Sequence, residues 1–552
     1  MTNVVDALKE VRSMNKKVIP FIIAIPSILL LLVFKIIPAI NSLFLSLKKY
    51  SIFKGLWGSP NVGLKNYADM FNSVHFTRLF GNTFRLSLFS ILFTCFFAIL
   101  LTICVSKMPN RIVKTISIVI ISIPAFIPIA SYTALVARGL SPDGGFINQI
   151  IMSLGSEPRF FLAENQYFSI IFALTDALRN VYIPVIIGVL ACEQKGINPG
   201  RIFMVIFIYA LIRATLFFSP DLETLQLFLN PMVYEKGDVF DTYAYRTGLV
   251  QGNMSFGSAV WITKTIAQLL VNILIYFILY SVLPKLKGLV NTLTDKVDNS
   301  ISSIISILGF VLLALGSIGI TVGAFFPSVI GEHTATFGEI RTMLSNKAFS
   351  SAVFNSLIYC VFSCILYGFI TITLAFPMTT KSKIYPIFLV LVMTFTNNIV
   401  GEYLVIRAFG LVNTYFAVIL QTSISVIGAF ALHFVVSEKF GNEVPTLFEY
   451  FKESLLPLVS IVGLFFIATW GGYLLQQITI SKPNNYGMGL MLKQMLTQPK
   501  DAQELLGFES SEAMRSSVIL LSSFIPVILG TVLICLNKIL PLSAFSSQAR
   551  KG

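Results

Sequence analysis

The stretch "NTFRLSLFSILFTCFFAILLTICVSK" (residues 82–107) decides the fold class of this chain. Most of it is apolar, and it is long enough to cross a bilayer as a helix, which needs about 20 apolar residues. A similar stretch, "NSLIYCVFSCILYGFITITLAFPMTTK", occupies residues 355–381. Each opens with Asn and a hydroxyl residue, continues as apolar sequence and ends in a basic turn. The chain therefore contains a weak internal repeat of membrane helices.

The composition of the whole chain agrees with this reading. The 552 residues are 55% hydrophobic and only 12% charged, and the mean hydropathy is +0.81. A soluble domain cannot bury so much apolar surface. We therefore predict an all-α polytopic membrane protein with about twelve transmembrane helices. The expected spans are 18–47, 80–107, 112–138, 166–190, 202–219, 257–284, 300–327, 352–378, 385–407, 414–436, 456–476 and 517–541.

Basic residues gather in alternate loops, for example "SKMPNRIVK" (residues 106–114) and "TTKSK" (residues 379–383). Such loops mark the cytoplasmic side of a membrane protein, which predicts that both termini are cytoplasmic. The first apolar run is too long for a signal peptide and is expected to remain as a membrane helix. Because the net charge of +14 is spread over these loops, it does not indicate a nucleic-acid partner.

The predicted spans form two sets of six. We expect a first permease half at residues 1–284, a polar cytoplasmic linker at residues 285–299 and a second half at residues 300–552. Both halves start in the cytoplasm, so they form a parallel repeat about an axis along the membrane normal. Transporters place the substrate site at such a repeat interface.

The sequence offers no catalytic or metal-binding constellation. It has no G-x-x-x-x-G-K-[ST] motif to cradle nucleotide phosphates, and no nucleophile–base or paired-carboxylate arrangement that predicts catalysis. The three histidines and six cysteines show no metal-ligand spacing. We expect a protein that is not an enzyme and binds no metal or cofactor itself. Energy for transport would come from a separate ATPase chain or from an ion gradient.

Ionisable residues interrupt the apolar runs and mark a candidate substrate pathway. A charge inside hydrocarbon costs roughly 3 kcal/mol on insertion scales, so these side chains are expected to face the bundle interior or water. Asp176 and Arg179 are close enough in sequence to pair on one helix face. A structural ion pair, such as one between Asp176 and Arg213, is the alternative to substrate contact. The residues concerned are Asp176, Arg179, Arg213, Lys264, Glu402 and Arg407.

Trp470 and Tyr473, in "FIATWGGYLL" (residues 466–475), are the aromatic candidates for the same pathway. Their rings offer flat surfaces on which the apolar C–H face of a sugar can stack. Packing of the rings against the small neighbours Gly471 and Gly472 is the alternative.

Several loops carry a family resemblance. "LSPDGGFINQIIMSLG" (residues 140–155), "FLAENQYFSIIFAL" (residues 161–174) and the segment 227–260 resemble the first permease of carbohydrate-uptake ABC importers, in the polysaccharide or lipoprotein-type branch. "LAFPMTTKSKIYPIFLVLVMTFTNNIVGEYLVIRAFGLVNTYFAVIL" (residues 374–420) is similar to the partner permease of these systems. The chain thus resembles a head-to-tail fusion of the two permeases.

The resemblance implies a type I ABC permease fold in the bacterial cytoplasmic membrane. It implies import of a carbohydrate, such as an oligosaccharide, by alternating access between the halves. The implied partners are an extracellular substrate-binding lipoprotein and a pair of cytoplasmic ATPase subunits, which would hydrolyse the ATP. The lipid bilayer is the surrounding solvent.

The cytoplasmic coupling loops depart from the family pattern, which is Glu-Ala-Ala, then Gly, then Leu-Pro. "ACEQKGINPGR" (residues 191–201) keeps only glycines, Gly196 and Gly200. "SEKFGNEVPTLFEYFKESLLPLV" (residues 437–459) has Gly441 and an amphipathic stretch with Leu447, Phe448 and Phe451 near one face. This stretch predicts either a helix on the membrane surface or a coupling helix that docks on an ATPase.

The degenerate loops leave two other functions open. The chain could be a permease descendant without a motor that serves as a channel, a sensor or a scaffold. A secondary transporter that uses Asp176 or Glu402 as a proton carrier is the weaker alternative.

Overall fold

The computed structural model describes residues 18–108, 110–195, 197–282, 337–380, 382–440, 444–497 and 512–536. Within these ranges the chain is helical and forms no β-strand, apart from one isolated bridge between Lys48 and Asn61. The predicted all-α polytopic fold is confirmed. The predicted linker at residues 285–299 and the span at 300–327 lie outside the described residues. Below, the N-terminal part means residues 18–282 and the C-terminal part means residues 337–536.

Among the described residues, six helices are long and apolar enough to cross a membrane, and four bent helix pairs raise the number to ten if each pair is one span. The predicted number of twelve is therefore not confirmed. The span expected at residues 202–219 corresponds to α11 (Pro199–Ala214), which has only 16 residues. The six long helices are Val18–Ser46, α5 (Val74–Ser106), α15 (Met254–Phe277), α20 (Lys347–Ala375), α25 (Leu447–Gly471) and α29 (Glu512–Leu536). The first of them contains η1 (Leu32–Ile36) and α2 (Ile37–Ser46), and α20 continues into η7 (Phe376–Thr380).

The bent pairs fall into two classes by angle. Two pairs bend by 97° and 95°, and the other two bend by 46° and 42°. The sharp pairs are α6 (Arg111–Phe126) with α7 (Ile129–Gly139) and α21 (Ile384–Thr394) with α22 (Ile399–Ala408). The milder pairs are α9 (Asn165–Asn180) with α10 (Tyr182–Lys195) and α23 (Tyr415–Ser423) with α24 (Ile427–Phe440).

Local sequence explains both sharp breaks. Pro128 lies between α6 and α7, and proline has no N–H to donate and disfavours helical backbone in the residue before it. Between α21 and α22, Asn397 has a φ of 54°, a left-handed conformation that asparagine tolerates better than most residues. The side chain of Asn398 then caps α22 by accepting a hydrogen bond from Gly401 N.

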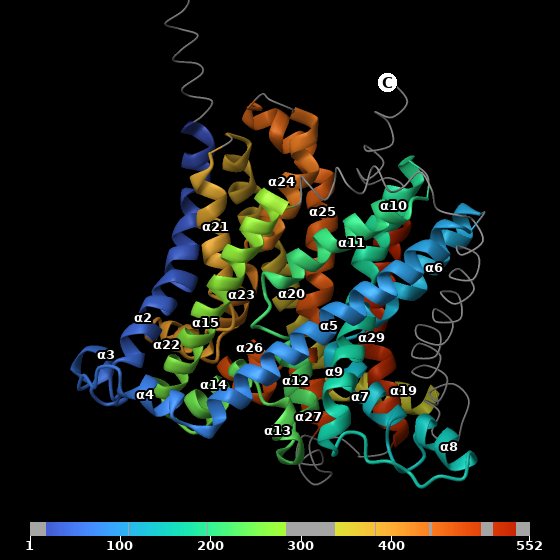
Figure 1. Ribbon diagram of the computed structural model, residues 1–552, viewed down its shortest axis with the longest axis horizontal. Helices are drawn as coiled ribbons and strands as arrows, with labels where there is room; N and C mark the ends of the chain where they lie inside the picture. Colours follow the sequence, from blue (N-terminus) through green and yellow to red (C-terminus); the bar gives the residue numbers. More distant parts are fainter. Residues whose placement is uncertain are drawn as a thin grey trace, which may run out of the picture.

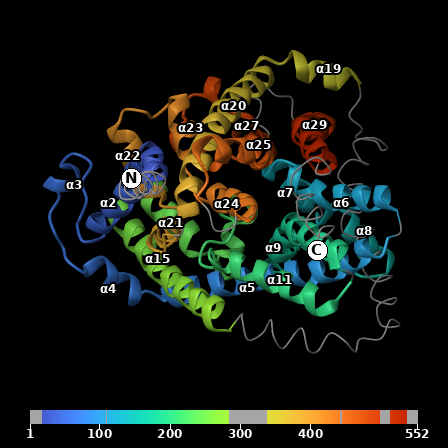
Figure 2. The same ribbon diagram turned by 90° about the horizontal axis from the view of Figure 1, so that it is seen from above.

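The long helices run between two ends of the molecule (Figures 1 and 2). In Figure 1 the short helices gather at the lower end, opposite the end at which α10 and α24 terminate. These short helices are α3 (Gly55–Gly58), α4 (Lys65–Phe71), α8 (Phe146–Ser153), α13 (Tyr234–Gly237), α14 (Phe240–Tyr245) and α27 (Met488–Thr497). The predicted topology places this lower end outside the cell.

The side chains of α20 are arranged as expected for a helix in a bilayer. Phe362 and Ile365 are 56% and 65% exposed, whereas Ser356, Ser363 and Thr371 are buried. A water-soluble helix has the opposite pattern, with polar residues outside. The exposed apolar face of α20 is therefore a lipid-facing surface.

The two helices of the sequence repeat make equivalent contacts. Asn82 on α5 donates from Nδ2 to two backbone carbonyls of the segment 235–238, both at 3.0 Å. Asn355 on α20 donates from Nδ2 to two carbonyls of the segment 484–486, at 2.8 and 3.0 Å. In each part of the chain, the repeated asparagine thus ties the second predicted helix to the loop that precedes the sixth.

Candidate functional site

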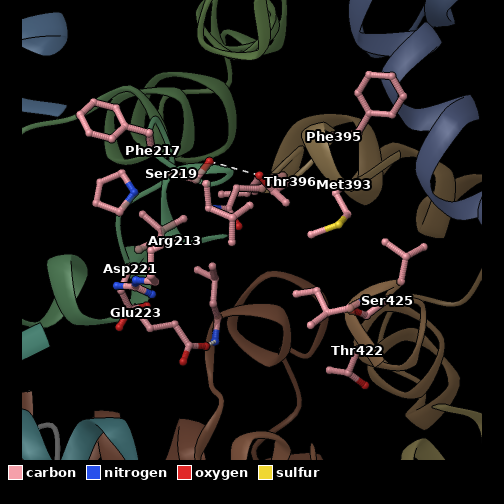
Figure 3. Close-up of a pocket in the computed structure, with 18 of the residues that line it drawn as sticks. Arg213, Phe217, Ser219, Asp221, Glu223, Met393, Phe395, Thr396, Thr422 and Ser425 are labelled. Carbon is pink, nitrogen blue, oxygen red and sulfur yellow. Dashed lines mark hydrogen bonds between the residues drawn. The ribbon is translucent and has the colours of Figure 1, made fainter. Parts of the chain in front are cut away.

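A cavity of about 560 Å³ lies between the N-terminal and C-terminal parts. We call it the central cavity. Residues of α5, α9, α11 and α12 (Leu222–Phe228) line it from one part, and the breaks of α21–α22 and α23–α24 line it from the other. Figure 3 shows Arg213 and Glu223 across the cavity from Thr422 and Ser425. Broken helices expose backbone groups where they border a polar cavity, as in transporter substrate sites.

Two of the predicted pathway residues, Asp176 and Arg213, form an ion pair on the N-terminal side of the cavity. Arg213 Nη2 lies 2.7 Å from Asp176 Oδ2, and Asn180 Nδ2 donates to the other carboxylate oxygen at 2.9 Å. The side chain of Asp176 is only 3% exposed, whereas that of Arg213 is 31% exposed. Arg179 lies over the ring of Tyr132 instead, 5.8 Å from its centroid. Asp176 is therefore neutralised from α11, and Arg213 presents one edge to the cavity.

A second ion pair crosses between the two parts. Lys35 Nζ of η1 lies 2.6 Å from Glu402 Oε1 of α22, and both residues line the central cavity. The sequence predicted Glu402 but missed Lys35, although a single Lys in the apolar run "LLVFKIIPAI" (residues 31–40) is a recognisable signal. Arg407, at the far end of α22, is exposed and does not line the cavity.

A third ion pair is fully buried beside the cavity. Lys264 Nζ donates to Asp241 Oδ1 at 2.7 Å, to Ser219 Oγ at 3.0 Å and to the carbonyl of Thr396 at 3.1 Å. Asn397 Nδ2 donates to the other Asp241 oxygen at 2.8 Å. The pair therefore holds the break between α21 and α22 against the N-terminal part. The sequence predicted Lys264 as a membrane charge without identifying its partner.

Glu223 is a cavity residue that sequence reasoning missed. Its Oε1 accepts hydrogen bonds from the backbone N–H groups of Tyr473 and Leu474, at 2.9 and 2.8 Å, and so caps the short helix α26 (Leu474–Thr479). Helix α12, which carries Glu223, belongs to none of the candidate membrane spans. Burial, reinforced by the nearby Asp221, raises the pKa of Glu223 to about 7.

The lining is polar with nearly balanced charge. The basic residues number three, Lys35, Arg179 and Arg213, and the acidic residues number four, Asp176, Asp221, Glu223 and Glu402. Hydroxyl and amide side chains fill much of the remainder: Ser87, Ser90, Asn180, Ser219, Thr396, Asn397, Gln421, Thr422 and Ser425. Many donors and acceptors with little net charge suit a polyhydroxylated solute.

The two predicted aromatic residues lie elsewhere. Trp470 is 1% exposed, and its Nε1 donates to the carbonyl of Ser522 at 3.0 Å. Tyr473 is fully buried, and its hydroxyl donates to the carbonyl of Glu223 at 2.7 Å. Neither residue lines the central cavity. Stacking of a sugar on these rings stays a prediction, and the contacts seen here are packing contacts.

The connection between α10 and α11 is short. Helix α10 ends at Lys195 and α11 begins at Pro199, so only residues 196–198 lie between them. Gly196 is outside the described residues, and Gly200 is the second residue of α11. Three residues cannot form a separate helix, since one turn already needs about 3.6 residues.

The corresponding connection in the C-terminal part is longer but equally lacks a separate helix among its described residues. Thr446 caps α25 in a capping box with Glu449, and α25 then continues without interruption to Gly471. The predicted amphipathic stretch is thus the first turns of a spanning helix. Its side chains Leu447, Phe448 and Phe451 are 42%, 79% and 43% exposed. Gly441 lies outside the described residues.

Comparisons with sequences and with solved structures find similar proteins. No protein-family model matches the chain. Protein LplB of Bacillus subtilis (strain 168) is 25% identical over 270 residues, which cover 45% of this chain and 85% of the relative. The polygalacturonan/rhamnogalacturonan transport system permease protein YteP of the same organism is 28% identical over 272 residues, covering 45% and 84%.

Among solved structures, a chain of a bacterial alginate ABC transporter, in complex with an alginate pentasaccharide-bound periplasmic protein, aligns with a TM-score of 0.43 at 22% identity. This alignment covers 49% of the present chain and 97% of the transporter chain. The sequence relatives confirm the resemblance to carbohydrate-uptake permeases that the sequence indicated. The chain is a relative of the permease subunits of carbohydrate-uptake ABC transport systems.

Proposed function

We propose that this chain forms the transmembrane pathway of an ABC-type importer for an oligosaccharide. The observation that carries the proposal is the central cavity, which is framed by broken helices of both parts and lined by hydroxyl, amide and charge-balanced groups. The relative YteP is a polygalacturonan/rhamnogalacturonan transport permease by name, which supports a saccharide as the solute. The pathway residues of the proposal are Asp176, Arg179, Arg213 and Glu402 with their partners.

The proposal includes two fused permease halves, residues 1–284 and 300–552, joined by a linker at 285–299. Two observations support it. The asparagines Asn82 and Asn355 make equivalent contacts in the two parts. The relatives LplB and YteP each align over about 85% of their own length yet match only 45% of this chain, which leaves room for a second permease unit.

Transport would proceed by alternating access, with the central cavity opening to either side of the membrane in turn. An extracellular binding lipoprotein would deliver the saccharide to the lower end of the molecule in Figure 1, and ATPase subunits would act at the opposite, cytoplasmic end, where both termini are expected. This chain would supply the pathway alone, and the partner subunits would hydrolyse ATP.

The pathway is tested by Arg213→Ala in cells that depend on this chain for oligosaccharide uptake. We expect uptake to fall at least tenfold while the protein still folds, because Arg213 faces the cavity. Arg407→Ala is the matched control, since that side chain is exposed and outside the cavity. Thermal unfolding of Arg213→Ala, Asp176→Asn and the double variant measures the structural coupling of the pair. Intact uptake by the double variant would remove this pair from the pathway.

A motorless permease descendant is the second candidate function, and the short connection between α10 and α11 favours it. The test is affinity purification from native membranes, which either recovers an ATPase subunit or does not. If one is recovered, we expect it to dock on the exposed Leu447 and Phe448, where burying two such side chains is worth roughly 3 to 6 kcal/mol before association costs.

Replacing both residues with Asp should then release the ATPase and abolish ATP-driven uptake. The control variant Gln194→Ala/Lys195→Ala should change little, because the α10–α11 connection offers little apolar surface. ATP-driven uptake that survives in the Asp variant would contradict docking on α25. Recovery of no ATPase with the wild-type chain would instead favour the motorless function.

A further inference from the structure

We propose that a second cavity, at the lower end of the molecule in Figure 1, binds the carboxylate of an acidic sugar residue. Its volume is about 790 Å³, and it shares no lining residue with the central cavity. We call it the outer pocket. The start of α5 contributes His75 and Arg78, and the segment from α13 to η3 (Arg246–Val250) contributes Tyr234, Tyr243 and Arg246. The inference rests on the proposed function, because it takes this end as the saccharide entrance.

Two guanidinium groups share one buried carboxylate beneath the outer pocket. Arg246 donates to both oxygens of Asp238, and Arg78 Nη2 lies 3.7 Å from Asp238 Oδ2. The Asp238 side chain is fully buried and also accepts a hydrogen bond from Thr242 Oγ1 at 2.7 Å. One carboxylate cannot neutralise two guanidinium groups. The Arg78 and Arg246 side chains remain 28% and 22% exposed, so donors of both can reach a ligand.

The surrounding charges add to this excess. Arg85 Nη2 donates to the carbonyl of Lys236 at 3.0 Å, and Lys236 Nζ lies 3.8 Å from Glu235 Oε1. Arg85, Lys236 and Asp238 do not line the outer pocket themselves but lie next to its lining residues. Together, the lining and these neighbours contain four basic side chains (Arg78, Arg85, Lys236 and Arg246) and two acidic ones (Glu235 and Asp238), an excess of two positive charges. A concave surface with such an excess attracts anions. Counted over lining residues alone, the outer pocket has two arginines and one carboxylate, that of Glu235, whereas the central cavity has three basic and four acidic residues.

The remaining lining indicates a sugar rather than a small inorganic anion. The rings of Tyr234 and Tyr243 flank the Arg246 guanidinium, at 4.4 and 5.3 Å, and the His75 ring lies 5.5 Å from that of Tyr243. Aromatic rings offer apolar surface to the C–H faces of a sugar. The amides of Asn165 and Gln251 line the same pocket and can bind hydroxyl groups.

Guanidinium geometry matches a carboxylate, because its planar fork can donate two parallel hydrogen bonds. The volume also falls within the range of about 300 to 1,000 Å³ that is typical of small-molecule sites. A uronate-type residue combines a carboxylate, an apolar face and hydroxyl groups, and so matches the arginine, aromatic and amide side chains of the outer pocket.

The test is binding of trigalacturonate to the purified full-length protein in nanodiscs at low ionic strength, by isothermal titration calorimetry, with maltotriose as the neutral comparison. We expect trigalacturonate to bind at least tenfold more tightly than maltotriose. Arg78→Gln should weaken trigalacturonate binding at least tenfold, and Arg78→Lys should restore part of it. Glu235→Gln, a change at an exposed acidic residue, should strengthen binding several-fold because it removes a repulsive charge.

Equal affinity for the two sugars, or an Arg78→Gln variant that binds like the wild type, would overturn the inference. Competition by an acidic hexapeptide at the affinity of trigalacturonate would reassign the outer pocket to a protein segment and also overturn it. A melting curve of each variant confirms that it is folded. Failure of the proposed function is distinguishable, because saccharide uptake in cells would then not depend on this chain, whereas trigalacturonate binding in nanodiscs would still be measured.

Discussion

The two sharply broken helices, α6–α7 and α21–α22, bend by nearly the same angle but are held in opposite ways. The break of α21–α22 meets charged and hydrogen-bonding groups of the N-terminal part, chiefly Lys264 and Asp241. The break of α6–α7 packs closely against glycines of the C-terminal part, and its polar contacts lie further along α7, where Ser131 and Arg138 are hydrogen-bonded to Ser522 and Ser516 at 3.3 Å. At the break itself, a Cβ on Gly471 would lie 2.8 Å from Pro128 Cα, and a Cβ on Gly530 would lie 2.4 Å from the Phe126 ring.

The two breaks also differ in how their exposed backbone groups are hydrogen-bonded. The Thr396 carbonyl at the α21–α22 break accepts hydrogen bonds from Trp261 Nε1 at 2.9 Å and from Lys264 Nζ at 3.1 Å. At the α6–α7 break, Pro128 has no N–H, and its carbonyl accepts a hydrogen bond from Tyr132 N at 2.9 Å. The first break therefore needs polar partners from another helix, whereas the second satisfies its carbonyl locally and is free to pack closely.

The two breaks are expected to differ in how easily they separate from their partners. We call the contacts of Lys264, Asp241 and Asn397 at the α21–α22 break the polar clamp, and the close contacts of Gly471 and Gly530 at the α6–α7 break the apolar seam. If the polar clamp opens, water from the central cavity can replace its lost hydrogen bonds, whereas nothing replaces the lost contacts of the apolar seam. We therefore expect the α21–α22 break to be the one that separates from its partner during transport, while the α6–α7 break remains packed.

Lys264→Met should have the largest effect on stability. It leaves Asp241 as an unpaired carboxylate, and both side chains are essentially fully buried. Removing one partner of a buried ion pair costs about 3 to 5 kcal/mol. Thermal unfolding in detergent should show a large decrease in Tm for Lys264→Met and partial recovery in Lys264→Met/Asp241→Asn. An unchanged Tm in the single variant would mean that the clamp does not hold the break.

Gly471→Ala should have an intermediate effect and tests the apolar seam. The added Cβ would lie 2.8 Å from the Pro128 Cα, a backbone atom that cannot move aside as a side chain can. Overpacking of this kind costs about 1 to 3 kcal/mol. Gly81→Ala on α5 is the matched control, because a Cβ there meets nothing within 4 Å, and it should be neutral or stabilising by up to about 1 kcal/mol. Equal Tm values for the two variants would refute close packing at the α6–α7 break.

The sequence predicted the membrane fold and the repeat because both depend on local pattern. Long apolar runs identify helices without knowledge of their neighbours, and Asn82 and Asn355 stand at equivalent positions of two such runs. The break at Asn397 was missed because the apolar run of residues 385–407 continues across it, with only "TNN" as a local signal. Hydropathy averages over such a short polar interruption.

Long-range partners could not be predicted for a different reason. Lys35 and Glu402 are separated by 367 positions in the chain, and Asp241 lies in α14, in the segment between two predicted spans. Periodicity tells which face of a helix is polar but not which other helix that face meets. Asp176 and Arg213 were foreseen as a possible pair because they lie on neighbouring predicted helices.

The smallest expected effect concerns pH and the contact between Glu223 and α26, which begins three residues after Gly471. Burial raises the pKa of Glu223 from its ordinary value of 4.5 to about 7. The folded protein therefore holds this proton more tightly than the unfolded chain. The resulting stabilisation is fully present below pH 4.5 and is lost as the pH rises through 7.

A shift of this size corresponds to roughly 3 kcal/mol when fully expressed. The carboxylate borders a water-accessible cavity, where solvent screens its charge, so we expect about 1 kcal/mol. Melting temperatures should thus decrease slightly between pH 5 and pH 7.5, and Glu223→Gln should reduce that slope. Lys493, whose pKa burial lowers to about 8, lies near Glu223 but titrates above this window.

As the pH rises, Glu223 and Lys493 change the stability of the protein in opposite directions, so their contributions can be separated. A lysine with a lowered pKa adds stability only as the pH rises above 8, because the unfolded chain then holds the proton more tightly. A slope that persists in Glu223→Gln between pH 5 and pH 7.5 would therefore exclude Glu223 as its source. It would also mean that the α12–α26 contact gains no stability from the proton on Glu223 and is held by its hydrogen bonds and packing, so that the polar clamp at α21–α22 is the more strongly electrostatic of these two contacts.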